Sequence, residues 1–142
     1  MISPARRIRI CIGAIAVGTA LAVAPTAFAA PAKVTITMGK GKPFQTSVSP
    51  ASAKAGKVTF TLKNKGTMVH EAVIIKTNVK VDKLPVKNGK ASEKGKVGAI
   101  LNVAGGKTSK PLTLNLKKGK YLIICNVPGH YQAGMRVAFT VK

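Results

Sequence analysis

The sequence predicts an all-β protein, an antiparallel β-sandwich of about seven to eight short strands. Several segments alternate apolar and polar residues with a period of two, which is typical of half-buried strands. Turn-forming residues separate these segments, and no stretch shows a convincing amphipathic helical pattern. The predicted strands are residues 33–38, 58–62, 69–75, 112–116, 121–124 and 137–141, with weaker candidates at 44–48 and 100–103.

Glycine, proline and asparagine mark the predicted turns. Asn64-Lys65-Gly66 and Asn88-Gly89 are examples of sequences that favour tight reversals. Residues 77–96 are rich in lysine and glycine and show no regular alternation, so we expect a long loop there. The sequence shows no internal repeat, which favours one sandwich rather than an array of units.

The first 29 residues are predicted to be a secretory signal peptide. Three arginines within residues 6–9 precede a short apolar run over residues 10–24, and residues 27–29 form a small-x-small cleavage pattern. A membrane anchor is the alternative, but the run is short for the ~20 residues that a span needs. We expect export to the periplasm, the medium or the cell surface, with the general secretory and twin-arginine routes both open. Residues 30–142 would form a single domain of 113 residues.

The chain is strongly basic, with 24 lysine and arginine residues against 3 aspartate and glutamate residues. Its formal net charge of +21 becomes +18 once the three arginines of the signal peptide are removed. Such a surface attracts anionic partners, anionic membrane surfaces or cell-wall polymers, and the attraction weakens with salt. Nucleic acid is not an expected partner, because the lysines are dispersed and only 2 tyrosines are available to stack on bases. We expect a monomer.

Cys125 is the single cysteine of the predicted mature domain, because Cys11 lies in the signal peptide. An intramolecular disulfide is therefore excluded, and a lone thiol in an oxidising compartment is a liability unless it is buried or bound to a metal. Cys125, His130 and Met135 follow one another at intervals of five residues around a Pro-Gly break. The other histidine of the chain, His70, opens a predicted strand upstream.

Each of these four residues has an ordinary interpretation when it is taken alone. A lone cysteine or methionine is commonly a buried apolar side chain, and a lone histidine is commonly a polar loop or core residue. Together they offer a thiolate, two imidazoles and a thioether, which is the donor set of a type 1 copper site. Sulfur donors stabilise Cu(I) and imidazoles hold Cu(II), so one such site suits both redox states.

Two segments resemble the ligand regions of the cupredoxins, the plastocyanin–azurin family of small type 1 blue copper proteins. The resemblance implies a Greek-key, cupredoxin-like sandwich that binds one copper ion. By resemblance, His70, Cys125 and His130 are the equatorial ligands, and Met135 is the axial ligand. The two segments are residues 62–71, LKNKGTMVHE, and residues 119–135, GKYLIICNVPGHYQAGM.

The chain departs from the family pattern beside two of these residues. Glu71 and Asn126 follow the first histidine and the cysteine, and we expect the Glu71 carboxylate to accept a hydrogen bond from the Asn126 amide. This bond would tie the two ligand regions together. Valine rather than proline stands at position 127, so the Val127 N–H is free to bond to the thiolate sulfur. Two N–H bonds to the sulfur would raise the reduction potential.

Residues 121–135 carry no charged side chain, although the rest of the chain is studded with lysine. We expect an apolar patch around the edge of His130. The family resemblance makes this patch an electron port, where a redox partner with an anionic docking surface binds briefly while lysines steer its approach. The patch would comprise Met68, Val127, Pro128 and Ala133.

The function expected from these features is that of an exported single-electron carrier. Copper storage or delivery without redox traffic is the alternative, because the same donors also suit a tightly held Cu(I) ion. A polyanion-binding module is a third hypothesis, motivated only by the charge. We do not expect an enzyme, because no third group that could orient a Cys-His pair and no oxyanion loop is apparent in the sequence.

Overall fold

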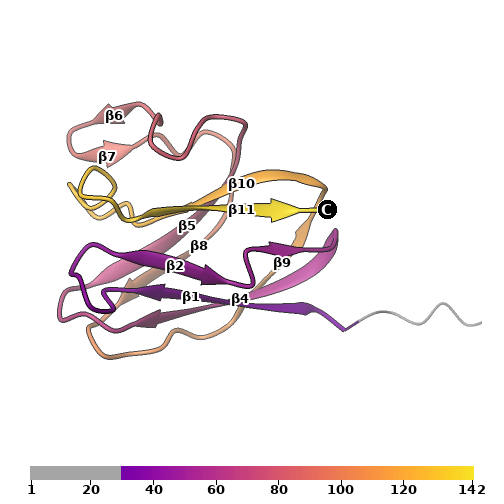
Figure 1. The fold of residues 1–142 in the computed structure, drawn as a ribbon, viewed down its shortest axis with the longest axis horizontal. Helices are drawn as coiled ribbons and strands as arrows, with labels where there is room; N and C mark the ends of the chain where they lie inside the picture. The colour runs from indigo at the N-terminus through magenta and orange to yellow at the C-terminus, as the bar shows by residue number, and fades with distance from the viewer. Residues whose placement is uncertain (1–29) are drawn as a thin grey trace, which may run out of the picture.

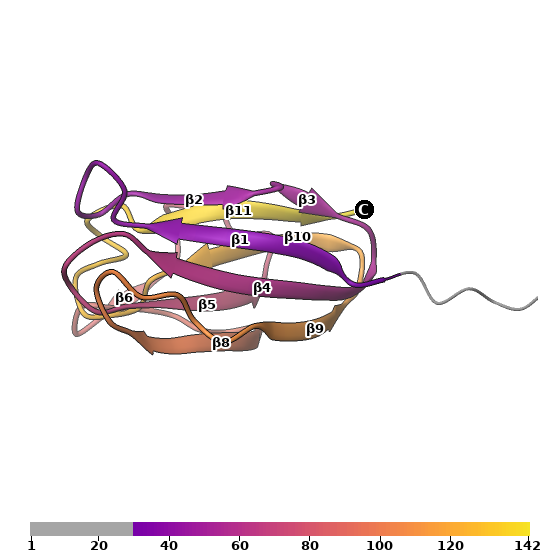
Figure 2. The same ribbon diagram turned by 90° about the horizontal axis from the view of Figure 1, so that it is seen from below.

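The computed structural model describes residues 30–142, and it shows two β-sheets packed face to face as a sandwich (Figures 1 and 2). The predicted signal peptide, residues 1–29, lies outside the described residues. The prediction of an all-β sandwich is confirmed. Within residues 30–142, no helix is long and apolar enough to cross a membrane.

The first sheet has four strands in the order β2-β1-β4-β9. The pairing of β1 with β4 is parallel, and the other two pairings are antiparallel. The parallel pair arises because the chain passes through β2 and β3 before it returns to the free side of β1. The strands are β1 (Ala32–Met38), β2 (Thr46–Ser49), β4 (Gly56–Asn64) and β9 (Leu112–Leu116).

The second sheet has five strands in the order β3-β11-β10-β5-β8, of which only the β3–β11 pairing is parallel. The sheets are therefore mixed rather than wholly antiparallel. The two sheets hold eight strands of four or more residues among the described residues, beside the two-residue β3, in agreement with the predicted number. The strands are β3 (Ser52–Ala53), β5 (His70–Lys76), β8 (Lys96–Val103), β10 (Gly119–Ile124) and β11 (Arg136–Val141).

The main core fills the space between the two sheets. Val34, Ile36 and Met38 alternate along β1 and all point inward, at no more than 1% exposure, because successive side chains of a strand face opposite sides. Phe60 of β4 and Phe139 of β11 meet across the sandwich edge to face, with ring centroids 5.5 Å apart. The apolar members of the predicted alternation thus form one continuous core.

Residues 77–96 were expected to be a long loop; Lys96 begins β8, and residues 77–95 cover the outer face of the second sheet. This segment contains a hairpin of β6 (Val86–Lys87) and β7 (Lys90–Ala91), so that expectation was wrong in part. The turn is Asn88-Gly89, where both residues have positive φ (51° and 76°), as a two-residue hairpin turn requires. Side chains of the segment pack on the outer face of β5 and β10 in a second apolar cluster. Because this segment covers their outer face, β5 and β10 are buried on both faces, which explains their nearly continuous apolar sequences.

The loops that follow β1, β4 and β10 lie together at one end of the sandwich (Figure 2). Strands β1 and β4 are parallel and therefore end on the same side. Strand β10 is antiparallel to β5, so the end of β10 meets the start of β5. In Figure 1 the β6–β7 hairpin lies close to the loop that joins β10 to β11. These loops carry the residues singled out in the sequence.

Candidate metal centre

The sheet places two of the predicted ligands on neighbouring strands. His70 is the first residue of β5, and Cys125 comes directly after the last residue of β10. The register pairs Ile124 with Val73, so the two positions lie at the same end of adjacent antiparallel strands. His130 lies in the loop between β10 and β11, which folds back over this end. Residues 55 positions apart in the chain are thus brought into contact.

Three donor atoms converge at this end of the sandwich. The Nδ1 atoms of His70 and His130 are 3.3 Å apart, and the Cys125 Sγ lies 3.4 Å from the His130 Nδ1 and 3.8 Å from the His70 Nδ1. Two donors bound to one ion at about 2.0–2.3 Å must lie within about 4.6 Å of each other. All three separations meet this condition, so the three atoms are placed to bind a single metal ion.

The fourth predicted ligand, Met135, closes the same loop. Its carbonyl accepts a hydrogen bond from the Cys125 N–H at 2.9 Å, and its N–H donates to the His130 carbonyl at 3.0 Å. The Met135 side chain is fully buried in the same core cluster as Cys125. These backbone hydrogen bonds hold Met135 next to Cys125 and His130. All four residues predicted from the sequence therefore lie at the same end of the sandwich.

Burial sets the protonation of the three donors. It lowers the pKa of both His70 and His130, and the proximity of His130 lowers that of His70 further. Burial raises the pKa of the Cys125 thiol, while the backbone N–H groups of Glu71 and Val127 counteract this by stabilising the thiolate. The Glu71 nitrogen is 3.5 Å from the Cys125 Sγ. The hydrogen bond to the sulfur that the described structure forms thus comes from Glu71, whereas the Val127 N–H lies where it favours the thiolate.

Copper binding is expected to release about one proton per chain at pH 7.5. The raised pKa keeps the Cys125 thiol protonated there, whereas the lowered pKa values of His70 and His130 leave both imidazoles neutral with free lone pairs. The apparent affinity should therefore rise about tenfold per pH unit, and imidazolium protons should add to the release only below about pH 6.5. Anaerobic calorimetric titration in two buffers of different ionisation enthalpy measures the count. Zero net release at pH 7.5 would contradict this protonation scheme.

The predicted side-chain bond between Glu71 and Asn126 is not formed in the described structure, so that expectation was wrong. The buried Asn126 amide instead faces the covering segment, where its Oδ1 accepts from the Ala91 N–H at 2.7 Å. Its Nδ2 donates to the Ala91 carbonyl at 3.0 Å and to the Glu93 carboxylate at 2.8 Å. Burial raises the pKa of the Glu71 carboxyl, and the backbone N–H of Asn126 counteracts this in part. The segment 77–95, which covers the second sheet, thus provides the hydrogen-bond partners that Asn126 uses in place of the Glu71 carboxylate.

A second hydrogen bond joins the loop between β10 and β11, here called the ligand loop because it carries His130, to the turn of the β6–β7 hairpin. The Gly129 N–H donates to the Gly89 carbonyl at 2.8 Å. A Cβ on Gly89 would meet Gly129 N at 3.2 Å, so the close approach depends on glycine. Together with Asn126, this contact fixes the position of the loop that carries His130.

The apolar surface around His130 includes a residue that the sequence analysis missed. The Phe44 ring packs edge to face on the His130 imidazole, with centroids 5.3 Å apart. Of the expected members, Met68, Pro128 and Ala133 are exposed, whereas Val127 is half-buried against the main core. His130 itself shows only 9% of its surface. Phe44 follows Pro43 in a weakly predicted segment, and nothing in its spacing pointed to the loop around His130. Only the fold brings it there.

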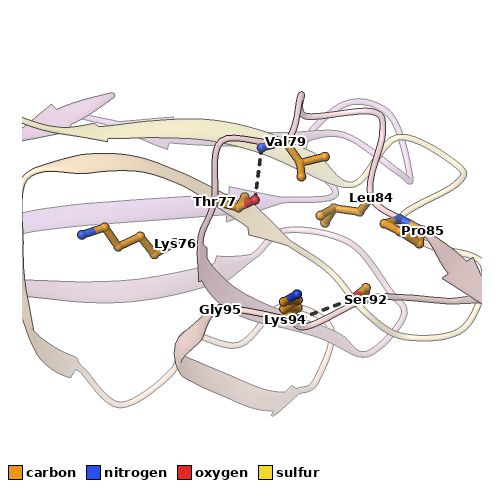
Figure 3. A pocket seen from close by; sticks show the side chains of 8 residues that line it. All are labelled: Lys76, Thr77, Val79, Leu84, Pro85, Ser92, Lys94 and Gly95. Carbon is orange, nitrogen blue, oxygen red and sulfur yellow. Dashed lines mark hydrogen bonds between the residues drawn. The ribbon is translucent and has the colours of Figure 1, made fainter.

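A separate pocket of about 490 Å³ lies between the covering segment and the end of β5 (Figure 3). Val79, Leu84 and Pro85 form its apolar side, and the Val79 N–H is bonded to the Thr77 hydroxyl at 3.1 Å. None of its lining residues belongs to the donor cluster. The converging side chains near His70 therefore define the candidate centre, and this pocket is not part of it.

The donor set fits copper. A thiolate and two imidazoles, with a buried methionine at hand, combine soft and borderline donors, which suits both Cu(I) and Cu(II). Carboxylates, which suit magnesium or calcium, do not join the cluster within the described residues. The cofactor expected from the sequence, one copper ion, thus agrees with the chemistry of the side chains.

Comparison with solved structures gives many matches of the same architecture. An auracyanin from the photosynthetic bacterium Roseiflexus castenholzii matches with a TM-score of 0.59 and 22% identity, over 80% of this chain and 99% of that chain. Rusticyanin from Thiobacillus ferrooxidans matches with a TM-score of 0.58 and 23% identity, over 78% and 76% of the two chains. Auracyanin B matches with a TM-score of 0.57 and 21% identity, over 80% and 91%. At these identities the likeness establishes the fold.

The fold is that of the cupredoxins, and the Cys-His-His cluster supplies three of the donors of a type 1 copper site. Within that class, the family model of the sulfocyanin (SoxE) domain matches residues 48–142, about two thirds of the chain. The chain therefore belongs to the sulfocyanin family. A comparison with curated protein sequences gives no significant match.

Proposed function

We propose that the protein is an exported single-electron carrier whose copper ion is held by His70, Cys125, His130 and Met135. The convergence of the Cys125 Sγ and the two imidazole Nδ1 atoms, all within 4.8 Å of one another, is the observation that carries this proposal. Copper bound there supplies a one-electron couple between Cu(I) and Cu(II). The surrounding residues hold the donors in one arrangement for both states.

The burial of the donors favours a carrier over a protein that delivers copper. His70, Cys125 and Met135 are fully buried, and His130 is exposed to only 9%. Transfer of the ion to another protein requires an incoming ligand to reach it, whereas electron transfer requires only a close approach. The single exposed imidazole edge supports the second process.

The surface around that edge supports transient docking. Phe44 and Met68 are exposed to 37% and 39%, and Pro128 and Ala133 are also exposed. Such a patch lets a partner come close without the cost of desolvating charges. The lysines outside it would guide a partner with an anionic surface and would make association faster at low salt. Export, with loss of residues 1–29, remains part of the proposal.

Reversible cycling of the copper-loaded mature domain tests the proposal. Addition of Cu(II) should produce an intense thiolate-to-copper absorption band, which should vanish on reduction and return on oxidation. Copper content measured before and after several cycles should stay at about one ion per chain. A delivery protein would instead lose copper to an added Cu(I) chelator on reduction. A colourless product would contradict the electron carrier.

A further inference from the structure

The outer face of the first sheet is open to solvent, whereas the covering segment, residues 77–95, lies on the second sheet. In Figure 2, β1 and β4 lie in front of the second sheet, and no described segment crosses over them. The apolar residues of β4 are buried in the core, so the residues that alternate with them point outward. These outward residues are Lys57, Thr59, Thr61 and Lys63, and they form a row along an inner strand of the sheet.

The strands beside β4 present the same kinds of side chain on this face. Lys33 and Thr35 of β1 lie opposite the two threonines of β4. On the other side, Thr113 of β9 lies opposite Thr59, and their hydroxyl oxygens are 2.8 Å apart. The remaining outward residues of the sheet are Thr37, Ser47, Ser49 and Asn115. The face therefore consists of hydroxyl, amide and ammonium groups.

The positive charge of this face has no local compensation. None of its residues is acidic, and the carboxylate residues of the chain lie elsewhere, Glu71 on β5 and Asp82 and Glu93 in the covering segment. Neighbouring strands of an exposed sheet are commonly stabilised by pairs of opposite charge, which this face lacks. Its lysines are exposed. An anion that approaches the face therefore meets ammonium groups that no carboxylate neutralises.

The spacing along β4 suits an extended chain better than a single ion. Lys57 and Lys63 are separated by about 20 Å, given the ~3.3 Å rise per residue of a strand, and Thr59 and Thr61 lie between them. Ammonium groups only donate hydrogen bonds, whereas threonine hydroxyls both donate and accept them. The fitting occupant is a polymer that carries anionic groups at intervals and neutral hydroxyls between them. A polysaccharide that contains uronic acids has this chemistry.

A lipid bilayer and a nucleic acid fit this face less well. An anionic bilayer would attract the lysines but would leave the rows of hydroxyl groups in water. The outward residues of the sheet include no large apolar side chain that could enter a bilayer and no aromatic ring on which a base could stack.

We propose that the outer face of the first sheet binds a linear acidic polysaccharide. The polymer would run along β4, with carboxylates at Lys57 and Lys63 and sugar hydroxyls at the two threonines between them. This binding goes beyond electron transfer and does not depend on copper. It would hold an exported protein in an acidic extracellular matrix. The end of the sandwich that carries His130 would stay free for a redox partner.

Alginate, a linear polymer of uronic acids, is the probe for this site. It is titrated calorimetrically into the copper-loaded mature domain at constant ionic strength. We expect saturable binding that weakens with added salt, and Lys57→Gln combined with Lys63→Gln should weaken it about tenfold or more. Lys87→Gln combined with Lys94→Gln removes the same charge from exposed positions of the covering segment and should have a much smaller effect. Equal losses in the two double variants would show a general charge effect and would overturn the proposal.

The hydroxyl groups are tested separately. Thr61→Val keeps the branched shape and the strand preference of the side chain but removes its hydroxyl, and it should weaken alginate binding severalfold. All these variants should keep the absorption band of the copper site, since none of them changes the donor cluster. An unchanged alginate affinity in Thr61→Val would contradict the polysaccharide site. Vesicles of phosphatidylcholine and phosphatidylglycerol provide the comparison with a membrane. Vesicle binding that depends on Lys57 and Lys63, without binding to alginate, would overturn the proposal as well.

Discussion

Replacing Cys125 by serine is expected to abolish the intense visible absorption of the copper-loaded protein and to weaken copper binding by about 100-fold or more. The thiolate is the only sulfur anion that the predicted mature chain can offer, and it lies within 3.4–3.8 Å of both imidazole Nδ1 atoms. A serine hydroxyl has nearly the same shape, but it stays protonated at neutral pH and is a hard donor. Absorption spectroscopy and competition with a copper chelator measure the two effects.

A matched control separates the donor from the core packing. Met38→Leu changes another fully buried sulfur side chain, on β1, and should leave the absorption band and the copper affinity unaltered. The serine variant should still fold, because it preserves the volume of the side chain. Retention of the band in Cys125→Ser would refute the assignment of Cys125 as a ligand.

Replacing Asn126 by alanine is expected to lower the free energy of unfolding of the copper-free protein by about 3 kcal/mol. Asn126 is 2% exposed, and its amide satisfies both the N–H and the carbonyl of Ala91 as well as the Glu93 carboxylate. Alanine would leave these groups of the covering segment without partners in a buried place. Urea denaturation gives the value directly.

The exposed Asn115 on β9 provides the comparison for this change. Asn115→Ala should alter the stability by less than about 0.5 kcal/mol, because surface substitutions are usually mild. Copper affinity should also fall about tenfold in Asn126→Ala, since the loop that carries His130 loses an anchor. Equal destabilisation by the two alanine substitutions would show that the bonds to Ala91 contribute nothing special.

The strands were predictable from the sequence where one face of the strand is buried and the other is exposed to solvent. Residues 112–116 alternate strictly, and β9 has those same bounds. Strand β8 was predicted only over its last four residues, because it lies at the edge of its sheet and exposes Val97 and Leu101. The parallel pairing of β1 with β4 could not be foreseen, since it depends on how the chain crosses between the sheets.

The site was predictable at its ligands because their chemistry is rare in this chain. His70 and His130 are its only histidines, and Cys125 is the one cysteine of residues 30–142. The contacts of Asn126 and Phe44 were not predictable. They are made with Ala91 and His130, and these pairs depend on the packing of the covering segment and of the β1–β2 loop against the ligand loop.

X-ray absorption at the copper edge tests the central claim most directly, once metal analysis has shown that the protein holds copper and not zinc. The claim predicts one copper ion per mature chain, bound by one thiolate sulfur and two imidazole nitrogens, with the sulfur lost in Cys125→Ser. Copper that is surrounded only by nitrogen and oxygen in the unmodified protein, or an unchanged spectrum in the serine variant, would contradict it.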